Sequence, residues 1–132
     1  MLLKRVFVLL VLLMLSMVFV GYAEESPWQY VETVKNEDIY INPISIKSYS
    51  QGPYDYVKCK VKIDNNNGTY NLYLMLINKD TKDWELPLME LYNNSNKLLH
   101  RMNAEGSWNR YEDGIFQNTI DAILELEQKG SK

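Results

Sequence analysis

Residues 54–77, YDYVKCKVKIDNNNGTYNLYLMLI, decide the fold. In the first half of this stretch every second residue is apolar, and these side chains would share one strand face: Val57, Cys59, Val61 and Ile63. The residues between them would share the other face: Tyr56, Lys58, Lys60 and Lys62. Such alternation is typical of a strand with one buried face and one face in water. Asn67-Gly68 then predicts a hairpin turn.

The returning strand of this hairpin, residues 70–77, is apolar on both faces. One side would carry Leu72, Leu74 and Leu76, and the other Tyr73, Met75 and Ile77. A strand without a polar side is typical of a position inside a sheet. We therefore expect this strand to be central, with something covering each of its faces.

Weaker strand signals surround the hairpin. Further strands are expected at residues 28–34, 39–46, 84–92 and 97–102, and a loop is expected at residues 48–53. Pro43 indicates an edge or a bulge in segment 39–46, and Pro87 indicates an irregularity in segment 84–92.

Residues 113–128 are expected to form a helix. Their apolar stripe recurs at spacings of three and four residues: Ile115, Phe116, Thr119, Ile120, Ile123 and Leu124. Asp113 is the expected N-cap, and Gly130 stands where the helix should end. The predicted fold class is therefore α+β: a meandering antiparallel β-sheet of about five to six strands with a C-terminal α-helix packed on one face.

Residues 1–23 have the layout of a secretory signal peptide. Lys4 and Arg5 precede the apolar run 6–20, and Gly21-Tyr22-Ala23 places small residues where a signal peptidase cleaves. The other interpretation is a retained membrane anchor, since the run is close to the shortest length that spans a bilayer. We favour cleavage, which leaves one exported domain without a membrane span, residues 24–132, in the periplasm, at the cell surface or secreted.

The domain that remains after cleavage is mildly acidic. Without Lys4 and Arg5, its 12 basic and 17 acidic residues leave a net charge of −5. Nucleic-acid binding depends on neutralising phosphates, so no nucleic-acid partner is expected. Cys59 is the single cysteine, and its place among the apolar residues of its strand predicts a buried thiol.

The sequence carries no recognisable catalytic or metal-binding pattern. His100 is the only histidine and has no reactive cysteine close to it in the chain. Asp80, Asp83 and Glu85 satisfy only part of a calcium-loop pattern, and neither a phosphate loop nor a nucleophile elbow is present. We expect no enzyme, no cofactor and no metal.

Two sets of residues are candidates for binding. Lys58, Lys60 and Lys62, with Tyr56, form either a solvated face that resists aggregation or a docking face for an acidic partner. The tryptophans either anchor the core, which we favour, or line a sugar site: Trp28, Trp84 and Trp108.

The order of these motifs resembles the surface-adhesin protein E-like domain of small exported bacterial proteins. The resemblance covers nearly all of residues 24–132 and rests on an ordered set of short matches: Trp28, Val31 and Val34; Tyr40-Ile41; Ser45-Ile46-Lys47; Val57-Lys58; Ile77-Asn78 with Trp84; Tyr92; Leu98; Trp108; and Asp121-Ala122-Ile123. Before the helix the chain has Glu112-Asp113-Gly114, where the family often has a Pro-Gly-Ser-type turn.

This resemblance implies an antiparallel sheet backed by a C-terminal helix, self-association as a homodimer, and binding to host extracellular-matrix proteins. The expected function is thus an exported, non-catalytic, adhesin-like module that attaches to a protein partner. The alternative is a cell-envelope protein that binds a small ligand or carbohydrate in a tryptophan-lined cavity between sheet and helix. Fold alone does not decide between them.

Overall fold

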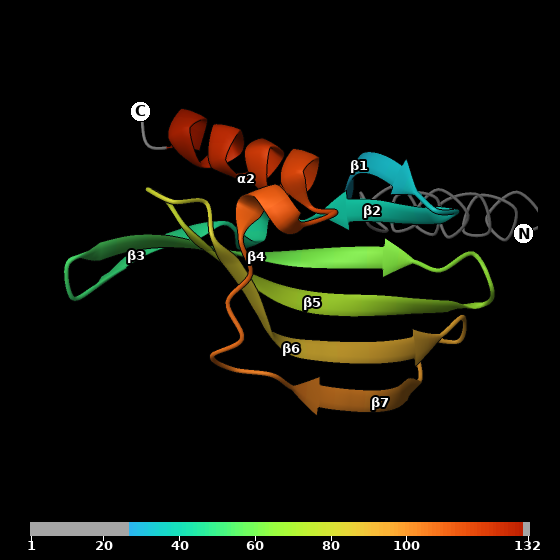
Figure 1. Ribbon diagram of the computed structural model, residues 1–132. Coiled ribbons are helices and arrows are strands. Elements are labelled where there is room, and N and C mark those ends of the chain that lie inside the picture. The colour runs from blue at the N-terminus through green and yellow to red at the C-terminus, as the bar shows by residue number, and fades with distance from the viewer. Residues whose placement is uncertain (1–26, 131–132) are drawn as a thin grey trace, which may run out of the picture.

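The computed structural model describes residues 27–130, which form an antiparallel sheet and one long helix (Figure 1). The strands are β1 (Gln29–Val34), β2 (Glu37–Ile41), β3 (Lys47–Gln51), β4 (Tyr54–Asp64), β5 (Thr69–Asn78), β6 (Trp84–Asn93) and β7 (Leu98–Asn103). The helices are η1 (Pro43–Ser45), η2 (Tyr111–Asp113), both 3-10, and α2 (Gln117–Gly130). The predicted α+β class is confirmed, whereas the expected signal peptide, residues 1–23, lies outside the described residues.

The hairpin of β4 and β5 forms the centre of the sheet. The strands lie in the order β1-β2-β4-β5-β6-β7, each antiparallel to its neighbour, and β3 pairs with β4 beside this path. β4 and β5 pair without interruption from Tyr56 and Asn78 to Asp64 and Tyr70. Gly68 in the connecting turn has a φ of 85°, a left-handed conformation that glycine adopts readily. The predicted hairpin is therefore confirmed.

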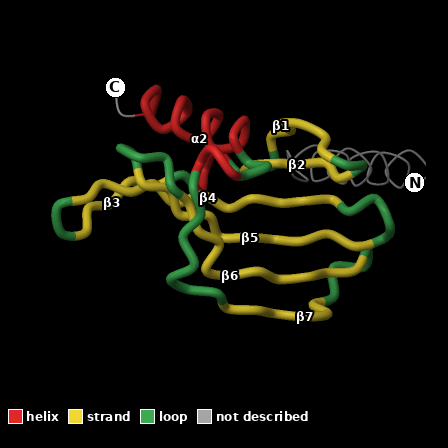
Figure 2. Tube along the Cα trace, in the orientation of Figure 1, coloured by secondary structure: helices red, strands yellow, loops and turns green. Residues whose placement is uncertain are grey.

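The predicted loop at residues 48–53 is wrong, and the extended segment predicted at residues 39–46, with an edge or a bulge at Pro43, ends earlier than expected. β2 ends at Ile41, and residues 47–51 form the additional strand β3 (Figure 2). β4 has 11 residues, and β2 pairs only with its second half. β3 pairs with the first half and thereby supplies partners for backbone groups that would otherwise lie unpaired along that edge.

A short 3-10 turn separates β2 from β3. The side chain of Asn42 accepts a hydrogen bond from the backbone N–H of Ile44 at 3.1 Å, which caps η1. Pro43 takes the first position of the turn, where no N–H is needed and where its fixed φ is suitable. Pro43 therefore begins a turn between two strands and does not interrupt one.

Pro87 lies in a β-bulge of β6, which confirms the predicted irregularity. Leu86 and Pro87 together oppose the single residue Met75 of β5. A bulge leaves one residue outside the regular ladder, so the missing N–H of proline is tolerated there. The extra residue also lets Trp84 face α2 while Leu88 faces the opposite side of the sheet.

α2 packs on one face of the sheet, against β1, β2 and β4 (Figure 1). The expectation that Asp113 caps this helix is wrong, because α2 begins only at Gln117 and Asp113 ends η2. Gly114 interrupts the helix with an extended backbone, φ −104° and ψ 156°, where it passes the indole of Trp84. Ile115 therefore precedes the helix and is exposed. α2 ends at Gly130, as predicted.

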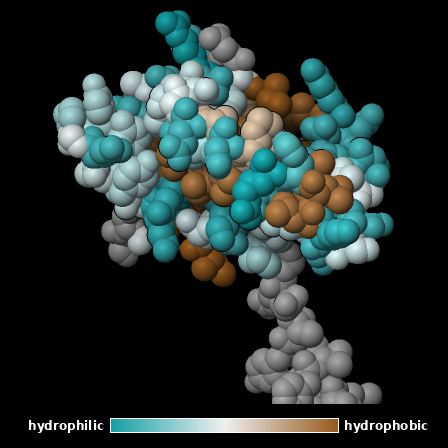
Figure 3. All heavy atoms as spheres, turned by 90° about the horizontal axis from the view of Figure 1, so that it is seen from below, coloured by the Kyte–Doolittle hydropathy of each residue, from teal (hydrophilic) through white to brown (hydrophobic). Residues whose placement is uncertain are grey.

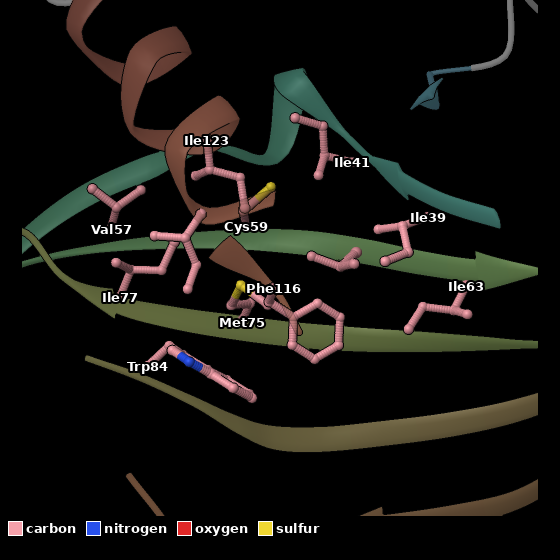
Figure 4. Close-up of a cluster of buried hydrophobic side chains, with 12 residues drawn as sticks. Ile39, Ile41, Val57, Cys59, Ile63, Met75, Ile77, Trp84, Phe116 and Ile123 are labelled. Carbon is pink, nitrogen blue, oxygen red and sulfur yellow. The ribbon is translucent and has the colours of Figure 1, made fainter. Parts of the chain in front are cut away.

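The core fills the layer between the sheet and α2 (Figure 4). The rings of Trp84 and Phe116 meet edge to face, with centroids 5.0 Å apart. Cys59 is fully buried, as predicted, and this burial raises the pKa of its thiol. Buried apolar side chains complete the layer: Ile39, Ile41, Val57, Val61, Ile63, Met75, Ile77, Ile120 and Ile123.

Candidate functional site: the open face of the sheet

The residues predicted to form a docking face lie together on the side of the sheet that α2 does not cover. We call this side the open face and the α2 side the covered face. Along β4, exposed or half-buried residues alternate with buried ones, as predicted. Lys58 and Lys60 are exposed, and Lys62 and Tyr56 are half-buried. The sequence therefore placed all four residues on the correct face.

A row of leucines lies directly beside these lysines. Across the β4–β5 ladder, the partners of Lys62, Lys60 and Lys58 are, in order, Leu72, Leu74 and Leu76. Leu88 of β6 extends the row as the partner of Leu74. We call these four leucines the leucine stripe, and all four are half-buried.

Within the described residues, the leucine stripe lies on the face of the central strand that carries no helix. Within residues 27–130, α2 is the only helix longer than one turn, and it packs on the covered face. Among the described residues, the leucines are shielded by neighbouring side chains of the sheet and by Trp28, Glu105 and Gly106, which line the hollows beside them. A contiguous apolar strip beside charged residues is typical of a surface that meets another molecule.

Two adjoining hollows follow the leucine stripe. The smaller, of about 160 Å³, has Trp28 and Glu90 among its lining residues. The larger, of about 680 Å³, extends toward Glu85. Both include Leu74 and Leu88 in their lining, so they form one groove along β5 and β6.

Aromatic side chains stand at one end of this groove. Tyr56 stacks on Tyr49 of β3, with centroids 5.3 Å apart and ring planes 22° apart. The ring of Trp108, which is 43% exposed, lies 5.7 Å from that of Tyr56. The pKa of Tyr49 is raised mainly by its partial burial and to a smaller extent by the nearby Tyr56. This end of the open face is therefore an aromatic surface in contact with water.

The other end of the groove is also aromatic, but it is organised around a lysine. Tyr70 and Tyr92 stack with centroids 5.2 Å apart and ring planes 10° apart. The ammonium nitrogen of Lys62 lies 4.6 Å from the centroid of Tyr70 and 5.9 Å from that of Trp28. Such cation–π contacts hold a charged group against apolar surface.

The sequence favoured core anchoring for all three tryptophans, but two of them lie on the open face. Trp84 is buried in the core, whereas Trp28 lines the groove and Trp108 is exposed beside Tyr56. Trp108 follows a loop whose backbone is tied to β6: Trp84 and Asn109 exchange two backbone hydrogen bonds, of 3.0 and 2.7 Å. This tie, which has no sequence signal, brings Trp108 to the open face.

The two sides of the groove differ in charge. On the β4 side, none of Lys58, Lys60 and Lys62 forms an ion pair within residues 27–130. On the far side, Arg101 donates two hydrogen bonds to Oε2 of Glu90, at 3.1 and 2.6 Å. These hydrogen bonds are the main cause that raises the pKa of Arg101. In the described part of the chain, the β4 side of the groove thus has three lysines without ion pairs, whereas on the far side Glu90 is paired with Arg101 and the carboxylate of Glu85 accepts a hydrogen bond from the N–H of Gly106.

The other candidate residues do not assemble into a reactive site. Among the described residues there is no group of three or more His, Cys, Asp or Glu side chains that could hold a metal ion. His100 is exposed on β7. The turn after β5 is held by Asn78, whose side-chain oxygen accepts from the backbone N–H groups of Asp80 and Thr81 at 2.9 and 3.2 Å. Glu85 faces away from that turn and accepts from the N–H of Gly106 at 2.7 Å.

The β7 edge is a second place where apolar side chains reach the surface. Figure 3, seen from the side of β7, shows apolar patches among polar ones. Leu98, Leu99 and Met102 are 40%, 50% and 47% exposed. Arg101 stands between them, and a charged side chain on an edge strand discourages pairing with another chain.

Comparison with known proteins identifies no relative. No protein-family model, no curated protein and no solved structure matches the chain. The resemblance to the surface-adhesin protein E-like domain therefore rests on the ordered residues quoted above. In the described part of the chain, none of the helices is both long and apolar enough to cross a membrane.

Proposed function

We propose that this chain is an exported, non-catalytic binding protein that attaches to a protein partner through the open face. The observation that carries this proposal is the half-buried leucine stripe, which no helix of residues 27–130 covers and which lies between a row of lysines and the Arg101–Glu90 pair. Tyrosine and tryptophan, the residues enriched in protein interfaces, stand at both ends of the same groove. Apolar centre, aromatic ends and charged rim are the usual anatomy of a binding surface.

Two features of the sequence support the exported location and the class of partner. The layout of residues 1–23 is that of a signal peptide, which would place the protein in the periplasm, at the cell surface or outside the cell. The ordered motifs resemble the surface-adhesin protein E-like domain, which makes host extracellular-matrix proteins the first partners to test.

The alternative of a small-ligand or carbohydrate carrier required a tryptophan-lined cavity between sheet and helix. In the described residues that layer holds one tryptophan, Trp84, and it is packed against Phe116. The hollow that Trp28 lines lies instead on the open face, beside the lysines. This placement favours a protein surface over an enclosed small molecule, since small-ligand sites usually enclose most of the ligand.

The proposal is tested by capturing the purified protein on immobilised extracellular-matrix proteins and on heparin at two salt concentrations. The double variant Lys58/Lys60→Ala removes two exposed charges from the open face. We expect its binding to a matrix protein to fall about fivefold or more at low salt, and less at high salt, because rim charges are screened.

The matched control is Lys35/Lys129→Ala, which removes two exposed lysines from the β1–β2 turn and from α2. Equal binding by the two double variants would contradict the proposal, because the open face would then contribute nothing particular. Capture by heparin alone would identify a polyanionic glycan in place of a protein and would also contradict it.

A further inference from the structure

We infer that the segment received by the open face is an amphipathic α-helix of the partner, with an apolar stripe seated on the leucine stripe and acidic residues along the side that faces β4. This inference rests on the proposed function and names the chemistry of the partner.

Backbone hydrogen bonding favours a helix over an extended segment. The strands beneath the groove, β4, β5 and β6, already use their N–H and C=O groups within the sheet. An extended peptide adds to the edge of a sheet, and on its face its backbone groups would meet apolar side chains without partners. A helix satisfies its own backbone groups and presents only side chains. α2 already makes this kind of contact on the covered face.

The dimensions of the groove match one helix. Lys60 on β4 and Glu90 on β6 lie two strands apart, about 10 Å at the usual strand spacing, and a helix with its side chains is roughly 10–12 Å wide. From Leu72 to Leu76 the stripe runs about 14 Å, the length of about nine helical residues. The partner thus needs roughly three apolar residues at helical spacing.

The smaller hollow is suited to one anchoring side chain. Its volume, about 160 Å³, is close to that of apolar cavities that hold a single benzene ring, about 150 Å³. Trp28, Leu72 and Leu88 are among its lining residues. A leucine or phenylalanine seated there would be largely removed from water, which is where interfaces concentrate their binding free energy.

The charges of the groove decide on which side the partner helix must carry acidic residues. Lys58, Lys60 and Lys62 lack ion-pair partners within residues 27–130, whereas Glu90 is neutralised by Arg101. Acidic residues are therefore needed only on the side of the helix that lies over β4. The chain's own apolar run, residues 6–20, contains no acidic residue and lacks this complementarity.

The test is a fluorescence-anisotropy titration of the purified protein with two alanine-based helical peptides. In the acidic peptide, leucines repeat along one stripe and a glutamate stands beside each leucine on the same side; in the basic peptide every glutamate is lysine. At low salt we expect the acidic peptide to bind about tenfold or more tightly than the basic one, and this ratio should shrink as salt rises.

Three variants locate the binding. Leu74→Asp should abolish binding of both peptides, since it places a charge at the junction of the two hollows. Lys60→Glu leaves Lys58 and Lys62 in place, so it should sharply reduce the advantage of the acidic peptide over the basic one, and it remains informative if Leu74→Asp does not fold. Lys129→Glu, on α2, should leave both affinities unchanged.

Several results would overturn the inference. They are equal binding of the two peptides, no effect of Lys60→Glu on their ratio, or self-association of the protein that Leu74→Asp abolishes, which would assign the groove to a second copy. If neither peptide binds while a matrix protein is still captured through Lys58 and Lys60, the helix inference fails and the proposed function stands. If the peptides bind as expected while no matrix protein is captured, the matrix-protein partner fails and the helix site stands.

Discussion

The two faces of the sheet are built from the same central strands but differ in what lies above them. On the covered face, Val57, Val61 and Met75 are completely buried beneath α2. On the open face, Leu72 and Leu74 belong to β5, the strand that also carries Met75, but they are only half-buried. Equal hydrophobicity therefore does not mean equal burial, because burial requires a second layer and the described chain supplies that layer once.

The largest expected difference between the two faces lies in the cost of truncating a side chain. Ile120→Ala, in the fully buried part of α2, should lower the free energy of unfolding by about 2–5 kcal/mol. Leu74→Ala should lower it by only about 1 kcal/mol, because that side chain is only partly buried. Urea denaturation of both variants measures the difference. Equal losses would indicate that another molecule or another part of the chain covers the open face.

A second prediction concerns the close contact at the entry to α2. A Cβ atom added at Gly114 would stand 2.9 Å from Cζ2 of Trp84, so Gly114→Ala should lower the free energy of unfolding by about 1–3 kcal/mol. Gly130→Ala is the matched control, since no atom lies within 4 Å of its added Cβ. There the gain in helix propensity should raise stability by less than about 1 kcal/mol. Thermal unfolding of the pair should give shifts of opposite sign, and parallel shifts would refute the contact.

A smaller effect is expected where α2 is tied to the sheet by polar groups. Oε1 of the buried Glu127 accepts hydrogen bonds from Ser48 at 2.6 Å and from Lys79 at 3.1 Å. Glu127→Ala should lower the free energy of unfolding by about 1–2 kcal/mol, a loss moderated because Lys79 is partly exposed and can be hydrated. Glu125→Ala, which breaks only the exposed pair with Lys129, should cost less than about 0.5 kcal/mol. Chemical denaturation at one fixed pH measures the free energy of unfolding of both variants. Equal losses would contradict a stabilising role for the hydrogen bonds of Glu127.

The smallest expected effect is the titration of the buried thiol. Burial raises the pKa of Cys59 above its ordinary value of 9.0, so the folded state retains the proton that the unfolded state loses. This contribution to stability is fully present below pH 9.0 and is lost as the pH rises through the folded-state pKa. At about pH 9.5 the loss should be less than about 1 kcal/mol.

The measurement for Cys59 is the slope of stability against pH in the wild type and in Cys59→Ala. The slope should be shallower in the variant than in the wild type. The slope that remains includes the contribution of Tyr73, because burial also raises the pKa of its hydroxyl group. The folded thiol should also react slowly with a thiol reagent and quickly in urea, because it is fully buried. Identical slopes together with fast reaction in the folded protein would show that Cys59 is accessible.

Local patterns predicted the centre of the fold well. The alternation around Cys59 and the Asn67-Gly68 turn identified the hairpin of β4 and β5, and the apolar spacing around Ile120 identified the helix. β3 was missed because its short, polar sequence forms a strand only where β4 extends beyond β2. Asp113 was misassigned as a cap because the contact of Gly114 with Trp84, which delays the helix, has no sequence signal.

The candidate site could be predicted only in part, because spacing shows which residues share a strand face but not what lies beside or above them. Lys58, Lys60 and Lys62 could be placed on one face from their spacing alone. The leucine stripe beside them could not, since it depends on which strand pairs with β4 and on which side the helix packs. One signal was nevertheless present: the sequence predicted a strand with two apolar faces and only one helix to cover them.

The bulge at Pro87 decides where β6 can change in length. Before the bulge, even-numbered residues such as Trp84 face α2; after it, even-numbered residues such as Leu88 and Glu90 face the groove. Because Leu86 and Pro87 together oppose Met75, deleting one residue at the bulge would leave a regular strand with Leu88 still on the open face, whereas deleting one residue after the bulge would exchange the faces of the residues that follow it. Over evolutionary time this strand should therefore tolerate the loss of one residue at the bulge but hardly any insertion or deletion elsewhere.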